Sequence, residues 1–96
     1  MSARLLTRAP ATSPARVKAI FFVDADADFG MLPRLLLPFA KLGVAPTRVH
    51  ASTENGDGGE MRVDLRAARV SPRTAHLLEK ALRGTVGVRS VIALVE

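Results

Sequence analysis

Residues 28–43 have the sequence DFGMLPRLLLPFAKLG. A glycine ends an apolar run, an amphipathic segment follows at once, and a second glycine, Gly43, closes it. This pattern is typical of a strand that turns into a helix through a loop with an exposed backbone. Such a loop can hold a small charged ligand without any catalytic side chain. The stretch therefore predicts a strand–loop–helix unit and makes its loop the first candidate for a functional site.

The helix of this unit is expected over residues 31–42. Its apolar side chains form one stripe at helical spacing, consisting of Leu32, Leu35, Leu36 and Phe39. Pro38 should kink the helix or remove its hydrogen bond back to Arg34. Met31 and Leu37 lie off the stripe, so they either add to the core or form a patch that a partner covers.

The remaining segments predict four strands and a second helix. The first strand is a continuous apolar run, typical of a central strand buried on both faces. The segment ENGDGGE at 54–60 predicts a hairpin loop. The second helix, residues 72–83, opens with Ser71 as N-cap and Pro72 in its first turn, and Gly84 ends it. The expected strands are Val17–Asp24, Val44–Thr53, Glu60–Arg69 and Val86–Val95, and the expected inward residues of the second helix are Ala75, Leu78, Ala81 and Leu82.

The order of these elements is β-α-β-β-α-β. It predicts an α+β ferredoxin-like βαββαβ sandwich, a four-stranded antiparallel sheet with two helices on one face. The first and third strands should be the inner ones. Residues 1–16 are rich in Pro, Ala, Ser and Arg and predict a mobile N-terminal tail, which leaves residues 17–96 as the folded domain.

The composition narrows the classes of function. The chain has 96 residues and no cysteine, which excludes disulfides and thiolate metal sites and favours a cytoplasmic location. No apolar run reaches the roughly 20 residues that span a bilayer, so no membrane association is expected. The net charge of +5 comes mostly from scattered arginines, and four Phe with no Trp or Tyr offer few platforms for bases, so nucleic acid is not an expected partner.

The acidic residues Asp24, Asp26 and Asp28 alternate with alanines and superficially resemble a calcium loop. Phe29 stands where such a loop needs glycine, and Leu35 stands where it needs glutamate. The favoured interpretation is a polar strand exit beside a helix N-terminus, where carboxylates suit the helix dipole.

The other chemically active side chains are isolated. His50 and His76 lie on different predicted elements and do not have the spacing of metal ligands. No serine is accompanied by the histidine and acidic residue that would make it a nucleophile. The sequence therefore predicts no catalytic residue, no metal site and no cofactor in this chain.

Residues 26–44, DADFGMLPRLLLPFAKLGV, resemble the ACT domain. The signature of that domain begins with a loop that contains an acidic residue or asparagine. Glycine, leucine and arginine follow at fixed spacing, and then a phenylalanine and a closing glycine. The positions in register are Gly30, Leu32, Arg34, Leu35, Phe39 and Gly43. Residues 70–91, VSPRTAHLLEKALRGTVGVRSV, are similar to the short small (regulatory) subunit of acetolactate synthase. The resemblance covers residues 17–95.

The resemblance implies a non-catalytic regulatory subunit of branched-chain amino-acid biosynthesis. Such a subunit binds and activates a large subunit that uses thiamine diphosphate, magnesium and FAD to condense pyruvate with a second 2-keto acid. ACT domains pair as homodimers or higher oligomers, and an amino-acid effector lies at their interface near the loop. The implied effector-binding residues are Asp26, Ala27, Asp28, Phe29, Gly30, Met31, Leu32 and Ala45.

Two of these positions depart from the family pattern. The valine-sensitive form has asparagines where this chain has Ala27 and Ala45, and alanine cannot hydrogen-bond the ligand. Weak or absent valine binding is therefore expected. Asp26 and Asp28 could bind an ammonium group instead, which leaves another amino acid open.

Two further functions stay open at this point. One is a stand-alone ACT module that senses an amino acid for a different enzyme. The other is a basic RNA-binding ferredoxin-like domain, which needs aromatic residues on the exposed face of its inner strands. Only Phe21 and Phe22 are candidates for that role.

Overall fold

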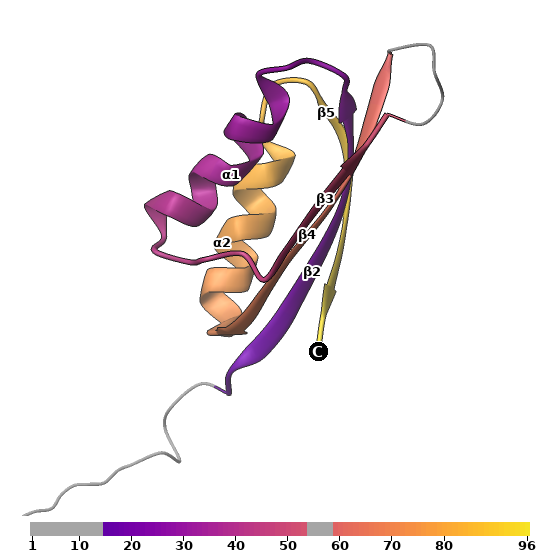
Figure 1. Cartoon of the computed structure of the whole chain (residues 1–96). Coiled ribbons are helices and arrows are strands. Elements are labelled where there is room, and N and C mark those ends of the chain that lie inside the picture. Colours follow the sequence, from indigo (N-terminus) through magenta and orange to yellow (C-terminus); the bar gives the residue numbers. More distant parts are fainter. Residues whose placement is uncertain (1–14, 54–58) are drawn as a thin grey trace, which may run out of the picture.

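The computed structural model describes residues 15–53 and 59–96, and it confirms the ferredoxin-like βαββαβ sandwich. The sheet is antiparallel with the order β3-β4-β2-β5, so the first and third strands are the inner ones. Both helices cover one face of this sheet (Figure 1). Most of the expected tail (1–14) and most of the expected hairpin loop (54–58) lie outside the described residues. The elements are β2 (Val17–Asp26), α1 (Met31–Lys41), β3 (Arg48–Ser52), β4 (Glu60–Val70), α2 (Pro72–Arg83) and β5 (Val88–Val95).

The core lies between the helices and the inner strands. The residues of β2 that face the helices, Ala19, Phe21, Val23 and Ala25, are all buried. Phe21 meets Phe39 of α1 edge to face, with ring centroids 6.4 Å apart. The expectation that β2 is buried on both faces is wrong for Phe22, which is 40% exposed because no helix covers the other face.

The second strand is shorter than expected, and before it the chain leaves α1 through a tight turn. Gly43 has a positive φ of 70° and donates to Ala40 O, while the N–H of Val44 donates to Phe39 O. These two hydrogen bonds form the Schellman motif, which satisfies the last carbonyl groups of a helix. Ladder pairing of β3 starts at Arg48 rather than Val44.

The first strand is longer than expected, and the last one begins later. Asp26 still belongs to β2, and its N–H donates to Gly87 O at 2.8 Å. Gly87 itself has a φ of 93°, so the regular ladder of β5 begins only at Val88.

The expected stripes pack against the core, although Leu32 and Leu36 of α1 are only partly buried. In α1, Met31 is fully buried and belongs to the core, whereas Leu37 is 50% exposed. The helix continues through Pro38 to Lys41. In α2, Ser71 caps the first turn by accepting from Thr74 N–H at 3.0 Å, as predicted. Three of the four expected inward residues are buried, but Ala81 is only half-buried because it faces α1 rather than the sheet.

Candidate functional site

The loop between β2 and α1 lies at one end of the sheet, beside the loop that joins α2 to β5 (Figure 1). The two loops meet at Gly87, which accepts a hydrogen bond from Asp26 N–H. A Cβ atom on Gly87 would lie 2.6 Å from the Cε of Met31, closer than packed atoms tolerate. The absence of a side chain at this glycine therefore allows the two loops to pack together.

Asp28 organises the start of α1. Its Oδ1 accepts the N–H of Gly30 at 2.9 Å, and its main-chain oxygen accepts the N–H of Met31 at 2.8 Å. Its Oδ2 lies 3.1 Å from Nη2 of Arg34. The Gly30 N–H first, and then the Arg34 guanidinium, hold the pKa of Asp28 below its ordinary value. A carboxylate of the chain itself thus occupies a backbone N–H of the loop that the sequence nominates for a small charged ligand.

Arg34 folds back over the loop and ties it to the segment between α2 and β5. Its Nη2 also donates to the carbonyl of Val86 at 3.5 Å, while its Nε is buried without a hydrogen-bond partner. A Cβ on Gly30 would lie only 2.9 Å from Nη1 of Arg34. Gly30 therefore makes room for the arginine. The signature includes both residues, but nothing in the spacing shows that one covers the other.

Asp26 is held by a second arginine. Arg89 Nε donates to Asp26 Oδ1 at 2.9 Å, and its Nη2 donates to Gly59 O at 3.0 Å. The register passes from Asp24–Ser90 to Ala25–Val88, which leaves Arg89 as an extra residue in β5. Such a bulge redirects a side chain. Both carboxylates that could have bound an ammonium group are therefore already paired with guanidinium groups.

The remaining candidate residues have different environments. Ala27 is half-buried and donates its N–H to Gly59 O at 3.3 Å, Leu32 packs against the core, and Phe29 is fully exposed. Ala45 follows the other end of α1. A helix of 11 residues is about 16 Å long. The structure brings residues 26–32 together but places Ala45 at the far end of the helix, so a single ligand could contact both regions only across two copies of the chain.

The two histidines do not form a second site within the part of the chain that the structure describes. His50 and His76 are exposed on β3 and α2, and within the described ranges no group of histidine and acidic side chains could hold a metal ion. Phe21 is buried, which leaves Phe22 as the candidate stacking residue on the open face of the inner strands. Among residues 15–53 and 59–96, no helix has the length and apolar character to cross a membrane.

Comparison with known proteins extends these observations. Residues 12–94 match the family model described as an ACT-like domain, and no curated protein matches the chain. The ACT domain of a GTP pyrophosphokinase from Chlorobium tepidum is 16% identical, with a TM-score of 0.68 and coverage of 82% of this chain and 99% of that one. The regulatory subunit of aspartate kinase from Thermus thermophilus is 12% identical, with a TM-score of 0.59. The match covers 83% of this chain and 51% of that one.

A third structure, the C-terminal domain of the MgtC protein from Mycobacterium tuberculosis, is 13% identical, with a TM-score of 0.62 and coverage of 85% of this chain and 88% of that one. At such identities the likeness concerns the fold alone. The family match is more informative because it extends over residues 12–94, most of the chain. This protein therefore belongs to the ACT-like domain family.

Proposed function

We propose that this chain is the non-catalytic regulatory subunit of an acetolactate synthase, and that it binds and activates a large subunit that carries out catalysis. ACT domains are regulatory modules that commonly pair and bind amino-acid effectors, and the chain belongs to this family. The likeness of residues 26–44 and 70–91 to the short small subunit supports the choice of partner.

One observation supports weak or absent valine sensitivity: the carboxylates of the loop between β2 and α1 and of the end of β2 are satisfied within the chain. Asp28 accepts from Gly30 N–H and pairs with Arg34, and Asp26 pairs with Arg89. Ala27 offers no polar side-chain atom to a ligand. Valine would have to displace existing hydrogen bonds and would gain few new ones. We therefore propose activation of the partner with weak or no valine sensitivity.

Co-purification with the large subunit tests the partnership. We expect a stable complex and a higher rate of acetolactate formation with this chain than without it. Titration calorimetry of the chain with valine tests the second part of the proposal. No heat of binding is expected at micromolar valine, and micromolar affinity would contradict it. Failure to form a complex would contradict the choice of partner.

A second candidate function is an ACT module that serves a different enzyme. The structures with the same fold include the ACT domain of a GTP pyrophosphokinase and the regulatory subunit of aspartate kinase, so this fold occurs in regulatory parts of different enzymes. The two candidates differ in their partner. Immobilised chain that retains an enzyme other than acetolactate synthase, and alters its activity, would favour the second.

A further inference from the structure

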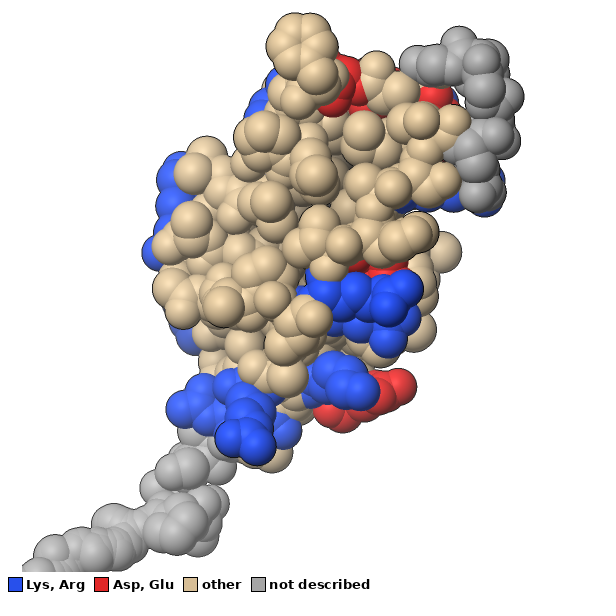
Figure 2. Space-filling view, viewed as in Figure 1, with Lys and Arg blue, Asp and Glu red and all other residues tan. Residues whose placement is uncertain are grey.

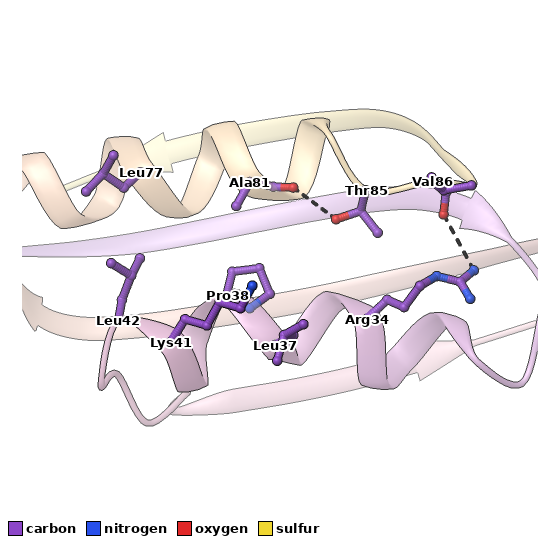
Figure 3. A pocket seen from close by; sticks show the side chains of 9 residues that line it. All are labelled: Arg34, Leu37, Pro38, Lys41, Leu42, Leu77, Ala81, Thr85 and Val86. Carbon is purple, nitrogen blue, oxygen red and sulfur yellow. Dashed lines mark hydrogen bonds between the residues drawn. The ribbon is translucent and has the colours of Figure 1, made fainter.

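A groove runs between α1 and α2 on the side of the helices away from the sheet. It encloses about 490 Å³ and is lined mainly by apolar side chains. Figure 3 shows Pro38 and Ala81 near its middle, with Leu42 and Leu77 toward one end and Arg34 and Val86 toward the other. Ala81 and Pro38 have small side chains, which leave space between their larger neighbours in the groove.

Apolar side chains at the groove are exposed to an unusual degree. Val86 is 81% exposed, Leu37 50% and Leu42 39%. Figure 2 shows a broad area without charged residues on the side of the helices that faces the viewer, with Lys and Arg side chains at its edge. A continuous apolar surface of this kind marks an interaction site more often than it marks ordinary solvent-facing protein.

The charges of the chain show what kind of partner fits this surface. Every acidic residue of the described ranges already forms an ion pair with an arginine or lysine. Five cations, in contrast, have no acidic partner among the described residues: Arg16, Lys41, Arg69, Arg73 and Lys80. The excess positive charge of the folded part is therefore carried by side chains that are free to pair with another molecule.

Three of these cations, Lys41, Arg73 and Lys80, lie on the helices that form the groove. Lys41 lines it directly, at the C-terminal end of α1. Arg73 and Lys80 lie four residues before and three residues after Leu77, and at these spacings side chains share a helix face. The groove thus combines an apolar floor with cationic side chains on the helices that flank it, and no acidic residue lines it.

A second copy of the chain does not fit this pattern. Its described acidic residues are already engaged, so stacking two copies groove to groove would bring unpaired cations together. The occupant must supply both apolar side chains and its own carboxylates. An amphipathic helix with an acidic flank has both, and helices pack readily into the groove between two others.

We propose that the groove between α1 and α2 docks an amphipathic helix of the partner enzyme, with its apolar face against Leu37, Leu77 and Ala81 and its acidic residues beside Lys41, Arg73 and Lys80. This inference rests on the proposed function, because it assumes a catalytic partner. It adds the surface and the chemistry through which the partner is recognised.

Substitutions that block the groove test the surface. Leu37→Asp places a charge on its wall, and Ala81→Trp fills its middle. Ile92→Asp is the matched control, because Ile92 is an exposed aliphatic residue on the opposite face of the sheet. With circular dichroism confirming that each variant is folded, we expect both groove variants to lose about tenfold or more in affinity for the large subunit. Ile92→Asp should bind like wild type. Unchanged binding of the groove variants would overturn the proposal while leaving the proposed function standing.

A second measurement keeps the groove testable if the wild-type chain does not bind the large subunit. The probe is a synthetic helix of about four turns with leucines at i, i+4, i+7 and i+11 and glutamates beside them. Its counterpart carries lysines in place of the glutamates. Fluorescence anisotropy should show at least tenfold tighter binding of the glutamate peptide, and Lys41→Glu combined with Lys80→Glu should remove this preference.

Equal affinity for the two peptides, or no binding of either, would overturn the proposal. It would also be overturned if sedimentation showed a dimer that Leu37→Asp dissociates, because the occupant would then be a second copy. Binding to phosphatidylserine vesicles that Leu37→Asp abolishes, without binding of the glutamate peptide, would count against it as well.

Discussion

At the scale of single residues, Gly30 and Gly87 serve the packing of the chain itself. Gly30 leaves room for the guanidinium of Arg34, and Gly87 leaves room for the methyl group of Met31. Only Gly87 combines this close contact with a positive φ, which is 93°. Replacing it should therefore disturb both the backbone and the packing between the two loops.

We expect Gly87→Ala to lower the free energy of unfolding by about 1–3 kcal/mol, because a side chain disfavours this backbone conformation and its Cβ would collide with Met31. Urea denaturation followed by circular dichroism measures the change. Gly84→Ala is the control: Gly84 has a φ of −87°, and the nearest atom to an added Cβ is 3.6 Å away. An equal loss in both variants would contradict the explanation.

Asp64 makes stability depend on pH. Hydrogen bonds from Arg66, with Arg48 nearby, hold the pKa of Asp64 below its ordinary value in the folded chain. A carboxyl group with a lowered folded pKa stabilises the protein above its unfolded pKa, and this contribution disappears as the pH falls through the folded pKa. The free energy of unfolding should therefore decline below about pH 4.

Asp64→Asn should flatten this decline, because it removes the titrating group. Urea denaturation at a series of pH values from 6 down to 2 measures the slope. The control is Glu96→Gln, since the Glu96 carboxylate lies 4.0 Å from its lysine partner on a largely exposed surface. An unchanged slope in Asp64→Asn would show that other carboxylates dominate the acid response.

At the scale of elements, α1 carries two prolines with different consequences. Pro33 lies in the first turn, where a backbone N–H would have no partner within the helix. Pro38 lies in the interior, so the carbonyl of Arg34 lacks its usual helical donor. Its ring contributes to the wall of the groove between the helices. A helix-breaking residue is thus retained at the surface proposed for partner binding.

We expect Pro38→Ala to raise the free energy of unfolding by about 1–3 kcal/mol, because it restores one hydrogen bond and removes the ring's conflict with the preceding turn. Pro33→Ala should change it by less than about 0.5 kcal/mol. Thermal and urea denaturation of both variants make the comparison. A loss of stability in Pro38→Ala would mean that the packing of the ring outweighs the missing bond.

At the scale of the whole molecule, α1 separates the two regions that the family resemblance assigns to one effector. Residues 26–32 lie at its start, and Ala45 follows its end. A small ligand cannot bridge this distance within one chain. An effector that contacts both regions must therefore bind between two copies and stabilise their pairing by mass action.

This geometry predicts the behaviour of an engineered site. Ala27→Asn combined with Ala45→Asn should create measurable valine affinity, because the amide groups supply hydrogen-bond donors and acceptors that alanine lacks. Valine should then shift the variant toward a dimer in sedimentation. Each single variant should respond less, and Ala40→Asn combined with Ala45→Asn serves as the control pair. Valine binding without any change in association would contradict a site between two copies.

The sequence by itself determined the elements, their order and the fold class, because these depend on local physics. The periods of the apolar residues separate strands from helices, and Ser71 and Gly43 mark helix ends through their own backbone and side-chain geometry. The early start of the expected second strand and the inward side assigned to Ala81 were wrong. Both depend on how neighbouring segments pack, which propensity does not encode.

Only the tertiary structure decided how the candidate loop is used and which surface stays open. The Arg89–Asp26 contact joins residues 63 apart in the chain, and the Arg34–Val86 contact joins residues 52 apart. The groove likewise exists because Pro38 and Ala81, from different helices, face each other. Such contacts require distant segments to be placed in space, so the sequence could nominate the loop between Asp26 and Leu32 but could not show that its carboxylates were already paired.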